Sequence, residues 1–141
     1  MKHACLALAL ALALSACGGN DRVALPDGTW GGDDAGVIVE GQAAHVHIGC
    51  TKGDTAAPIA LDGDGEFAVR GLYNVNAYPV DQGILHPARF TGRVSGNEMT
   101  LQVQLLDTDQ RLGPVTLRLG RNPDMRRCPI CRSPHERVPR P

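Results

Sequence analysis

Histidine and cysteine residues with the spacing of metal ligands occur at two places in this sequence. His45 and His47 are two residues apart, so both side chains leave the same face of a strand. Cys128, Cys131 and His135 form a Cys-x2-Cys-x3-His cluster near the C-terminus. Thiolate and imidazole ligands at such spacing suit zinc or copper. The candidate metal ligands are therefore His45 and His47 on a strand and Cys131 and His135 in the tail.

Each of these patterns also has a simpler interpretation. His45 and His47 face away from Val46 and Ile48, as two solvated residues on an outer face would, and oxidation of the cysteines would remove the thiolates. The acidic run of residues 62–66 lacks the spacing of an EF-hand loop, and its Asp-Gly repeats are what a hairpin turn requires. We therefore expect no resident metal and no other cofactor, and keep metal binding as an alternative.

The sequence shows no constellation for catalysis or for nucleic-acid binding. It contains no Gly-x-Ser-x-Gly, His-Glu-x-x-His or Gly-x-x-x-x-Gly-Lys motif, which argues against an enzyme. Acidic residues outnumber basic ones from Asp21 to Asn122, whereas nucleic-acid binding needs a basic face to neutralise phosphates. We expect a non-enzymatic protein that binds no nucleic acid.

The N-terminus has the pattern of a secretory signal. Lys2 supplies a positive charge, and an uncharged Ala/Leu run follows from Leu6 to Leu14. Such a run is far shorter than the roughly 20 apolar residues that span a bilayer. A positive start followed by a short apolar run is typical of an export signal.

The end of this signal, Leu14-Ser15-Ala16-Cys17, resembles the lipobox of bacterial lipoproteins. The resemblance implies that residues 1–16 are a cleaved signal peptide, that Cys17 carries a diacylglycerol, and that residues 17–23 form a flexible tether. Gly18 stands where an Asp often retains lipoproteins on the inner membrane, so we expect an anchor in the outer membrane, facing the periplasm. Membrane lipid through Cys17 is then one partner. The alternative is an ordinary signal cut nearby, with Cys17 a spare thiol.

Three cysteines remain to pair in the oxidising envelope. Cys50 follows Val46 and Ile48 on the inner side of a strand, and Cys128 follows the last expected strand. The rival pair, Cys128 with Cys131, has redox-motif spacing but lacks the βαβ setting in which such motifs act. We predict a Cys50–Cys128 disulfide with Cys131 left over.

Period-2 alternation predicts short strands separated by Gly, Asp and Asn turns. The clearest strand runs from Glu98 to Leu105 and pairs with Ala88 to Val94 through a turn at residues 95–97. Two further hairpins are expected, one from strands 37–40 and 43–50 and one from strands 59–61 and 66–69, with residues 62–65 as the turn of the second. A last strand is expected at 115–119 and a first one around residues 29–30. The prediction is all-β: a small antiparallel β-barrel or β-sandwich of about eight strands. It spans residues 24–122, and residues 123–141 form a basic tail rich in Pro and Arg.

Two resemblances accompany this fold. Gly28-Thr29-Trp30 resembles the Gly-x-Trp motif of calycins, the lipocalin and avidin-like barrels, which implies a barrel with Trp30 at one end. The chain also resembles a family of small bacterial lipoproteins of unknown function. This second resemblance rests on the same motif, Cys50, the segment 87–96, the Met99-x-Leu101-x-Val103 pattern and Cys128. These likenesses imply fold and location and carry no activity.

The longest unpatterned connection, Tyr73 to Pro87, is the candidate partner loop, with Tyr73, Tyr78 and His86 as its contact residues. We expect Trp30 and two Phe residues to belong to the core. The leading hypothesis is a membrane-anchored, non-enzymatic envelope lipoprotein whose β-domain binds a partner, such as an envelope protein, or a small ligand, or has a structural role. The alternatives are an inhibitor or accessory subunit of a secreted hydrolase, and a metal-binding envelope protein.

Overall fold

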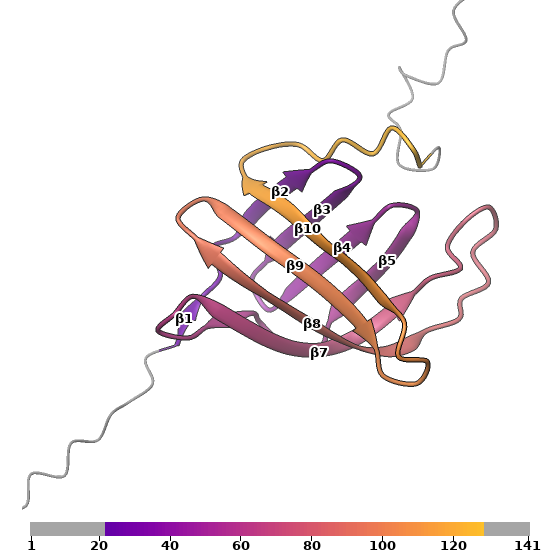
Figure 1. The fold of residues 1–141 in the computed structure, drawn as a ribbon, viewed down its shortest axis with the longest axis horizontal. Coiled ribbons are helices and arrows are strands. Elements are labelled where there is room, and N and C mark those ends of the chain that lie inside the picture. Colours follow the sequence, from indigo (N-terminus) through magenta and orange to yellow (C-terminus); the bar gives the residue numbers. More distant parts are fainter. Residues whose placement is uncertain (1–21, 129–141) are drawn as a thin grey trace, which may run out of the picture.

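The computed structural model describes residues 22–128, which form ten β-strands (Figure 1). The bounds of the strands are β1 Val23–Ala24, β2 Gly28–Gly32, β3 Ala35–Glu40, β4 Ala43–Ile48, β5 Thr51–Thr55, β6 Ala60–Leu61, β7 Glu66–Asn74, β8 His86–Ser95, β9 Glu98–Leu105 and β10 Arg111–Leu119. The predicted signal peptide, Cys17, Cys131 and His135 lie outside the described residues.

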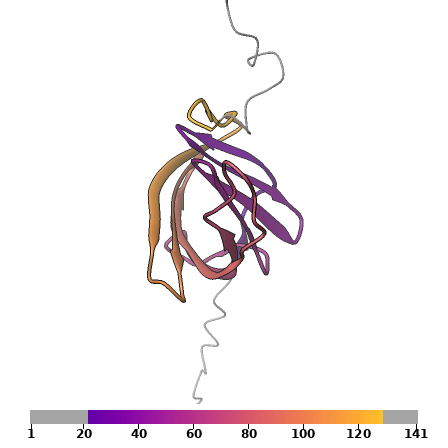
Figure 2. The same cartoon turned by 90° about the vertical axis from the view of Figure 1, so that its right-hand side faces the viewer.

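Eight of the strands close into an antiparallel barrel in the order β10-β2-β3-β4-β5-β7-β8-β9. Figure 2 shows these strands surrounding the interior. The two remaining strands, β1 and β6, form a separate two-stranded sheet at one end. The all-β prediction is confirmed, and of its two architectures the protein adopts the closed barrel.

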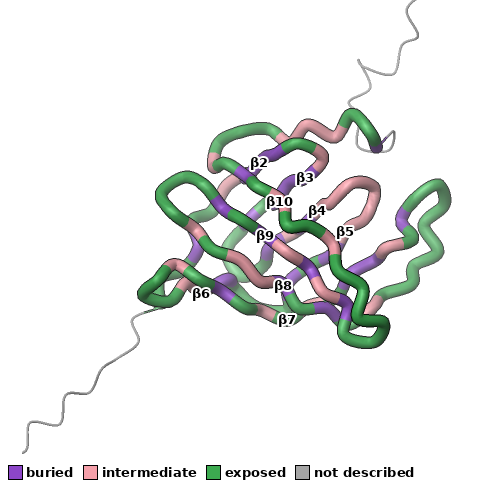
Figure 3. Tube along the Cα trace, viewed as in Figure 1, coloured by how far each residue is buried: buried purple, intermediate pink, exposed green. Residues whose placement is uncertain are grey.

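Alternating side chains fill the interior of the barrel. In β9 the apolar residues from Met99 to Leu105 are buried, whereas Glu98 and Thr100 are exposed (Figure 3). An eight-stranded barrel has an interior just wide enough for side chains to fill. The largest side chains that fill it are Trp30, Tyr73, Phe90, Met99, Leu101, Leu105 and Leu117. The predicted core positions of Trp30, Phe67 and Phe90 are confirmed.

The structure corrects the hairpin expected at residues 59–61 and 66–69. β6 pairs with β1, and β7 pairs with β5 and β8 instead. Asp62 nevertheless makes a turn before β7, because its Oδ1 accepts hydrogen bonds from the N–H groups of Asp64 and Glu66. The contacts of Asp62 therefore agree with the prediction that residues 62–66 contain a turn.

The sequence pattern does not predict β5, because the residues of β5 that face the interior are not apolar. Its buried residues are Gly53 and Thr55. A Cβ on Gly53 would overlap the ring of Tyr73, so the aromatic side chain occupies the space that an apolar residue of β5 would fill. Cys50 accordingly lies in the turn between β4 and β5, beyond the end of β4 at Ile48.

Residues 120–128, named here the C-terminal strap, cross the outside of the barrel (Figure 1). The N–H of Asp124 donates to the carbonyl of Gly32, and the N–H of Asp34 donates to the carbonyl of Asp124, each at 2.9 Å. A Cβ on Gly31 would overlap the strap backbone, so this glycine makes room for its passage over β2. The boundary expected after Asn122 thus falls inside a segment that packs on the barrel.

Candidate functional site

The connection between β7 and β8 projects from one end of the barrel. The last paired residues are Tyr73 and His86, so residues 75–85 form the loop itself. Figure 1 shows this loop extending past the barrel on the right, while β1 lies at the opposite end. The predicted partner loop is therefore shorter than expected, because its two ends belong to strands.

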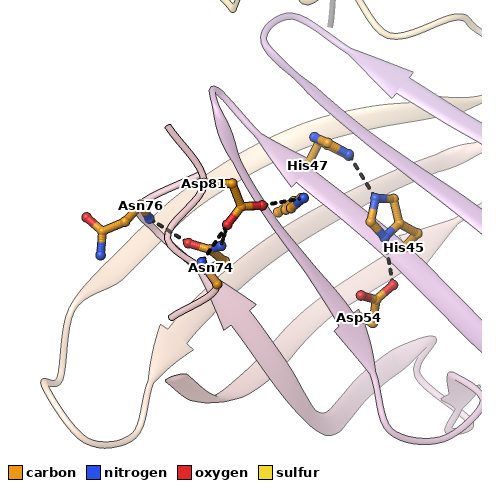
Figure 4. Close-up of polar contacts among 8 residues, drawn as sticks. His45, His47, Asp54, Asn74, Asn76 and Asp81 are labelled. Carbon is orange, nitrogen blue, oxygen red and sulfur yellow. Dashed lines mark hydrogen bonds and ion pairs between the residues drawn. The ribbon is translucent and has the colours of Figure 1, made fainter. Parts of the chain in front are cut away.

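A polar network at the base of the loop holds its conformation (Figure 4). Asp81 Oδ1 accepts hydrogen bonds from Asn74 Nδ2 at 2.7 Å and from the N–H of Gly83 at 2.8 Å. Asp81 Oδ2 forms an ion pair with Lys52 Nζ at 2.8 Å. Asn74, buried at the end of β7, accepts a further bond from the N–H of Asn76. One carboxylate thus joins the loop to β5 and β7.

These contacts also set the charge state of Asp81. The hydrogen bond from Lys52, followed by those from Gly83 and Asn74, lowers the pKa of Asp81 from 3.8 to about 2. Each contact favours the ionised carboxylate, which is the form that accepts hydrogen bonds through both oxygens. The network is therefore fully charged at any pH above about 4.

The loop carries apolar side chains that the barrel does not bury. Six such residues gather around it and are named here the apolar end patch: Leu72, Tyr78, Val80, Ile84, Leu85 and Leu106. Val80 is 70% exposed and Leu85 is 57% exposed. Leu72 and Leu106 flank the loop, since Leu72 pairs with Pro87 and the N–H of Leu106 donates to the carbonyl of Pro87. Grouped exposed apolar residues are typical of interaction sites.

Two of the three predicted contact residues are engaged elsewhere. Tyr73 is fully buried, and its hydroxyl lies 2.8 Å from Thr51 Oγ1. Burial raises the pKa of Tyr73 to about 12. This side chain therefore supports the base of the loop from inside the barrel, because its position in β7 turns it inward. Of the three, only Tyr78 is exposed, at 45% of its surface.

His86 begins β8 and contacts the next loop along the chain. Its Nδ1 donates to Asp107 Oδ2 at 2.8 Å, and its side chain is only 18% exposed. This hydrogen bond lowers the pKa of Asp107 below its usual range. His86 therefore ties the two loops at this end of the barrel together.

Sequence reasoning did not identify the network or the patch. The signals available were Asp81 two residues before Gly83, a spacing typical of an Asx turn, and the apolar residues Val80, Ile84 and Leu85 in an otherwise unpatterned loop. The partners of Asp81 could not be inferred, because Lys52 belongs to a strand that was itself not predicted.

The histidines of β4 form a second polar cluster, on the outer face of the barrel. His45 Nδ1 donates to Asp54 Oδ1 at 2.6 Å, and His45 Nε2 lies 2.9 Å from His47 Nε2 (Figure 4). Burial, and then the charges of His45 and Lys52, lower the pKa of His47 below 6.5. Within residues 22–128, no three His, Cys, Asp or Glu side chains gather in a metal-binding group.

The predicted disulfide joins the strap to the β4–β5 turn. Cys50 and Cys128 are bonded, with their Cα atoms 5.1 Å apart, and Cys128 is fully buried. The bond closes a loop over a sequence separation of 78 residues. It therefore fixes the far end of the strap beside the same barrel end as the apolar end patch.

Comparisons of the chain with protein-family models, with curated proteins and with solved structures found no match. Over the described part of the chain, no helix has the length and apolar character needed to cross a bilayer.

Proposed function

We propose that this protein is a lipid-anchored lipoprotein of the bacterial cell envelope, with a non-enzymatic barrel that binds an envelope protein through the apolar end patch. The lipobox resemblance at residues 14–17 supports the anchor, in the outer membrane and facing the periplasm. The closed eight-stranded barrel and the buried Trp30 agree with the calycin-like resemblance. The observation that carries the proposal is the protruding loop 75–85, which exposes apolar side chains and is tied to β5 and β7 through Asp81.

The loop has the properties of a preorganised binding surface. Ordering a loop on association costs free energy, and a loop that is already fixed by Asp81 avoids much of this cost. Its exposed residues include Tyr78, and tyrosines are frequent among the side chains that dominate binding energy. The filled interior leaves little room for a small ligand, so the outer surface and its loops are where recognition takes place.

The position of the patch favours a protein partner over the anchoring membrane. The chain enters the barrel at Val23, at the end opposite the loop. A lipid anchor upstream of Val23 holds that end toward the membrane, and the patch then faces away from it. A rigid protruding loop is also what an inhibitor of a secreted hydrolase would use, so such a hydrolase is one class of partner for the same surface.

The experiment is photo-crosslinking in the envelope of the bacterium that makes the protein. A photoreactive phenylalanine analogue replaces Tyr78 in the full-length chain, and in a control chain it replaces Asn97, in the turn at the opposite end. We expect a discrete protein adduct from position 78 and none of that mass from position 97. The adduct should disappear when Val80→Asp is combined with the probe at position 78.

Three results would overturn the proposal. They are the same adduct from both positions, no protein adduct from position 78, and an adduct with phospholipid alone at position 78. A second measurement tests the unlipidated chain with vesicles of phosphatidylglycerol and phosphatidylethanolamine, to which we expect no binding. If the chain binds these vesicles and Val80→Asp abolishes the binding, the patch is a membrane contact and the proposal is overturned.

A further inference from the structure

The two histidines of β4 place their coordinating nitrogens at the same point on the barrel surface. Figure 4 shows the ring of His47 pointing toward that of His45, with Asp54 on the other side of His45. The Nε2 atoms are 2.9 Å apart, and the ring planes are 70° apart. Two nitrogens that bind one ion at about 2.0–2.1 Å and at right angles are also separated by roughly 2.9 Å. The pair therefore has the spacing of two adjacent ligands. An ion that replaces the proton between the two rings, with a rotation of the His47 ring, would meet a lone pair from each.

Asp54 prepares His45 for such a role. The hydrogen bond from Nδ1 to the Asp54 carboxylate places the proton of neutral His45 on Nδ1 and leaves an electron pair on Nε2, which accepts a hydrogen bond from His47 Nε2 in the structure. Metal-binding histidines usually donate their other ring N–H to a carboxylate or carbonyl in this way. The charges that face the pair are Asp54 and Lys52, and the Lys52 ammonium group is paired with Asp81.

The C-terminal strap brings a methionine to the recess beside the two histidines. A recess of about 130 Å³ opens beside the pair, and its lining is Gly36, Ile38, His45, His47, Pro123 and Met125. Apart from the two histidines the lining is apolar, and Met125 is the one other lining residue whose side chain carries a metal-binding atom, a thioether sulfur. The strap is held in place by its contacts with Gly32 and Asp34 and by the Cys50–Cys128 bond.

This donor set selects among metals. Calcium and magnesium require several oxygen ligands, and structural zinc sites use thiolates, imidazoles and carboxylates in sets of four. Imidazole together with thioether suits copper, which also heads the affinity order of the divalent first-row metals. Within residues 22–128 no three His, Cys, Asp or Glu side chains gather as a metal-binding group, so the further donor that this recess offers is a methionine.

We propose that His45, His47 and Met125 bind one copper ion, with Asp54 as a positioning residue for His45. This site is independent of the apolar end patch, which contains none of these residues. The recess makes the ion accessible from the surface, so the site fits transient binding or transfer of copper in the envelope.

The test is a titration of the folded, unlipidated full mature chain with Cu(II) sulfate, followed by native mass spectrometry and electron paramagnetic resonance. Parallel titrations use Cu(I), supplied without oxygen as its acetonitrile complex, and zinc sulfate. We expect one copper ion per chain, with nitrogen hyperfine coupling in the Cu(II) spectrum and weaker binding of zinc. His45→Gln and His47→Gln should each weaken copper binding at least tenfold.

The variants separate the parts of the proposal. Met125→Leu should weaken Cu(I) more than Cu(II), because the thioether is the soft ligand, and Asp54→Asn should weaken both about tenfold while retaining the nitrogen coupling. His86→Gln is the matched control, because His86 begins β8 and does not line the recess; this variant should bind copper as tightly as the unaltered chain does. Full copper affinity in His47→Gln, or equal losses in His86→Gln and His47→Gln, would overturn the site. Loss of copper only in Cys131→Ser with His135→Gln would assign it to the tail instead.

Discussion

Asp81 is the residue on which the conformation of the 75–85 loop depends most directly. Asp81→Asn removes the charge and the oxygen that pair with Lys52, and it leaves the N–H of Gly83 with a neutral amide oxygen, which accepts more weakly than a carboxylate. We predict that the amide of Gly83 then exchanges with solvent at least tenfold faster, while the melting temperature of the barrel is unchanged. Hydrogen exchange measured by NMR checks this, with Asp64→Asn in an exposed turn as the control. Unchanged protection of Gly83 would show that the network does not hold the loop.

The same carboxylate predicts a pH dependence with a definite sign. The pKa of folded Asp81 is lowered from 3.8 to about 2, so its contacts are fully present above about pH 4 and are lost as the pH falls through about 2. Protection of the Gly83 amide, compared with that of a barrel amide at each pH, should therefore persist at pH 3. Loss of protection of the Gly83 amide between pH 5 and 4 would contradict the lowered pKa of Asp81.

Tyr73 and Tyr78 form a natural comparison between a buried and an exposed hydroxyl. Tyr73→Phe leaves Thr51 Oγ1 without the partner it has at 2.8 Å, and the loss of such a buried hydrogen bond costs about 1 kcal/mol. Tyr78→Phe changes a residue that is 45% exposed, and it should leave the free energy of unfolding unchanged. Urea unfolding of both variants measures the difference, and equal stabilities would refute the role given to the Tyr73 hydroxyl.

Among the elements, the C-terminal strap depends on the absence of a side chain at Gly31. A Cβ there would overlap the backbone of residues 121–123, and relief of such an overlap costs about 1–3 kcal/mol. Gly31→Ala should therefore lower the stability of the barrel and make the Cys50–Cys128 bond easier to reduce. Gly63→Ala is the matched control, because nothing lies near a Cβ at that position. Equal behaviour of the two variants would mean that the strap does not press on β2.

Some strands could be predicted from the sequence pattern and others could not. Met99 to Leu105 alternate with polar residues, and this period predicted β9 and its hairpin with β8. β5 could not be predicted in this way, because Gly53 leaves its inward space to Tyr73, a residue of another strand. The pairing of β6 with β1 was missed for a related reason, since a strand of two residues has no period. The His45–His47 pair was visible in the sequence, but Asp54 and Met125 joined it only through the barrel and the strap.

At the scale of the whole molecule, the Cys50–Cys128 disulfide links the far end of the strap covalently to the β4–β5 turn of the barrel. By the chain-entropy argument, closing a loop over 78 residues stabilises the fold by about 4 kcal/mol, a large part of the stability of a small domain. Cys50→Ser with Cys128→Ser should lose about that amount, whereas Cys131→Ser should lose none. Urea unfolding with and without reductant measures both, and full stability of the double variant would contradict the predicted role of the bond.

Anchoring by lipid is the claim on which the proposed function depends first, because it places the barrel in the envelope and orients the patch. The most direct measurement is mass spectrometry of the intact protein and its N-terminal peptide, isolated from the membranes of cells that produce it. The account predicts a chain that begins at Cys17 and carries a diacylglycerol on that residue, with no such mass in Cys17→Ser. A mature chain that begins elsewhere, or that begins at Cys17 with an unmodified thiol, would contradict it.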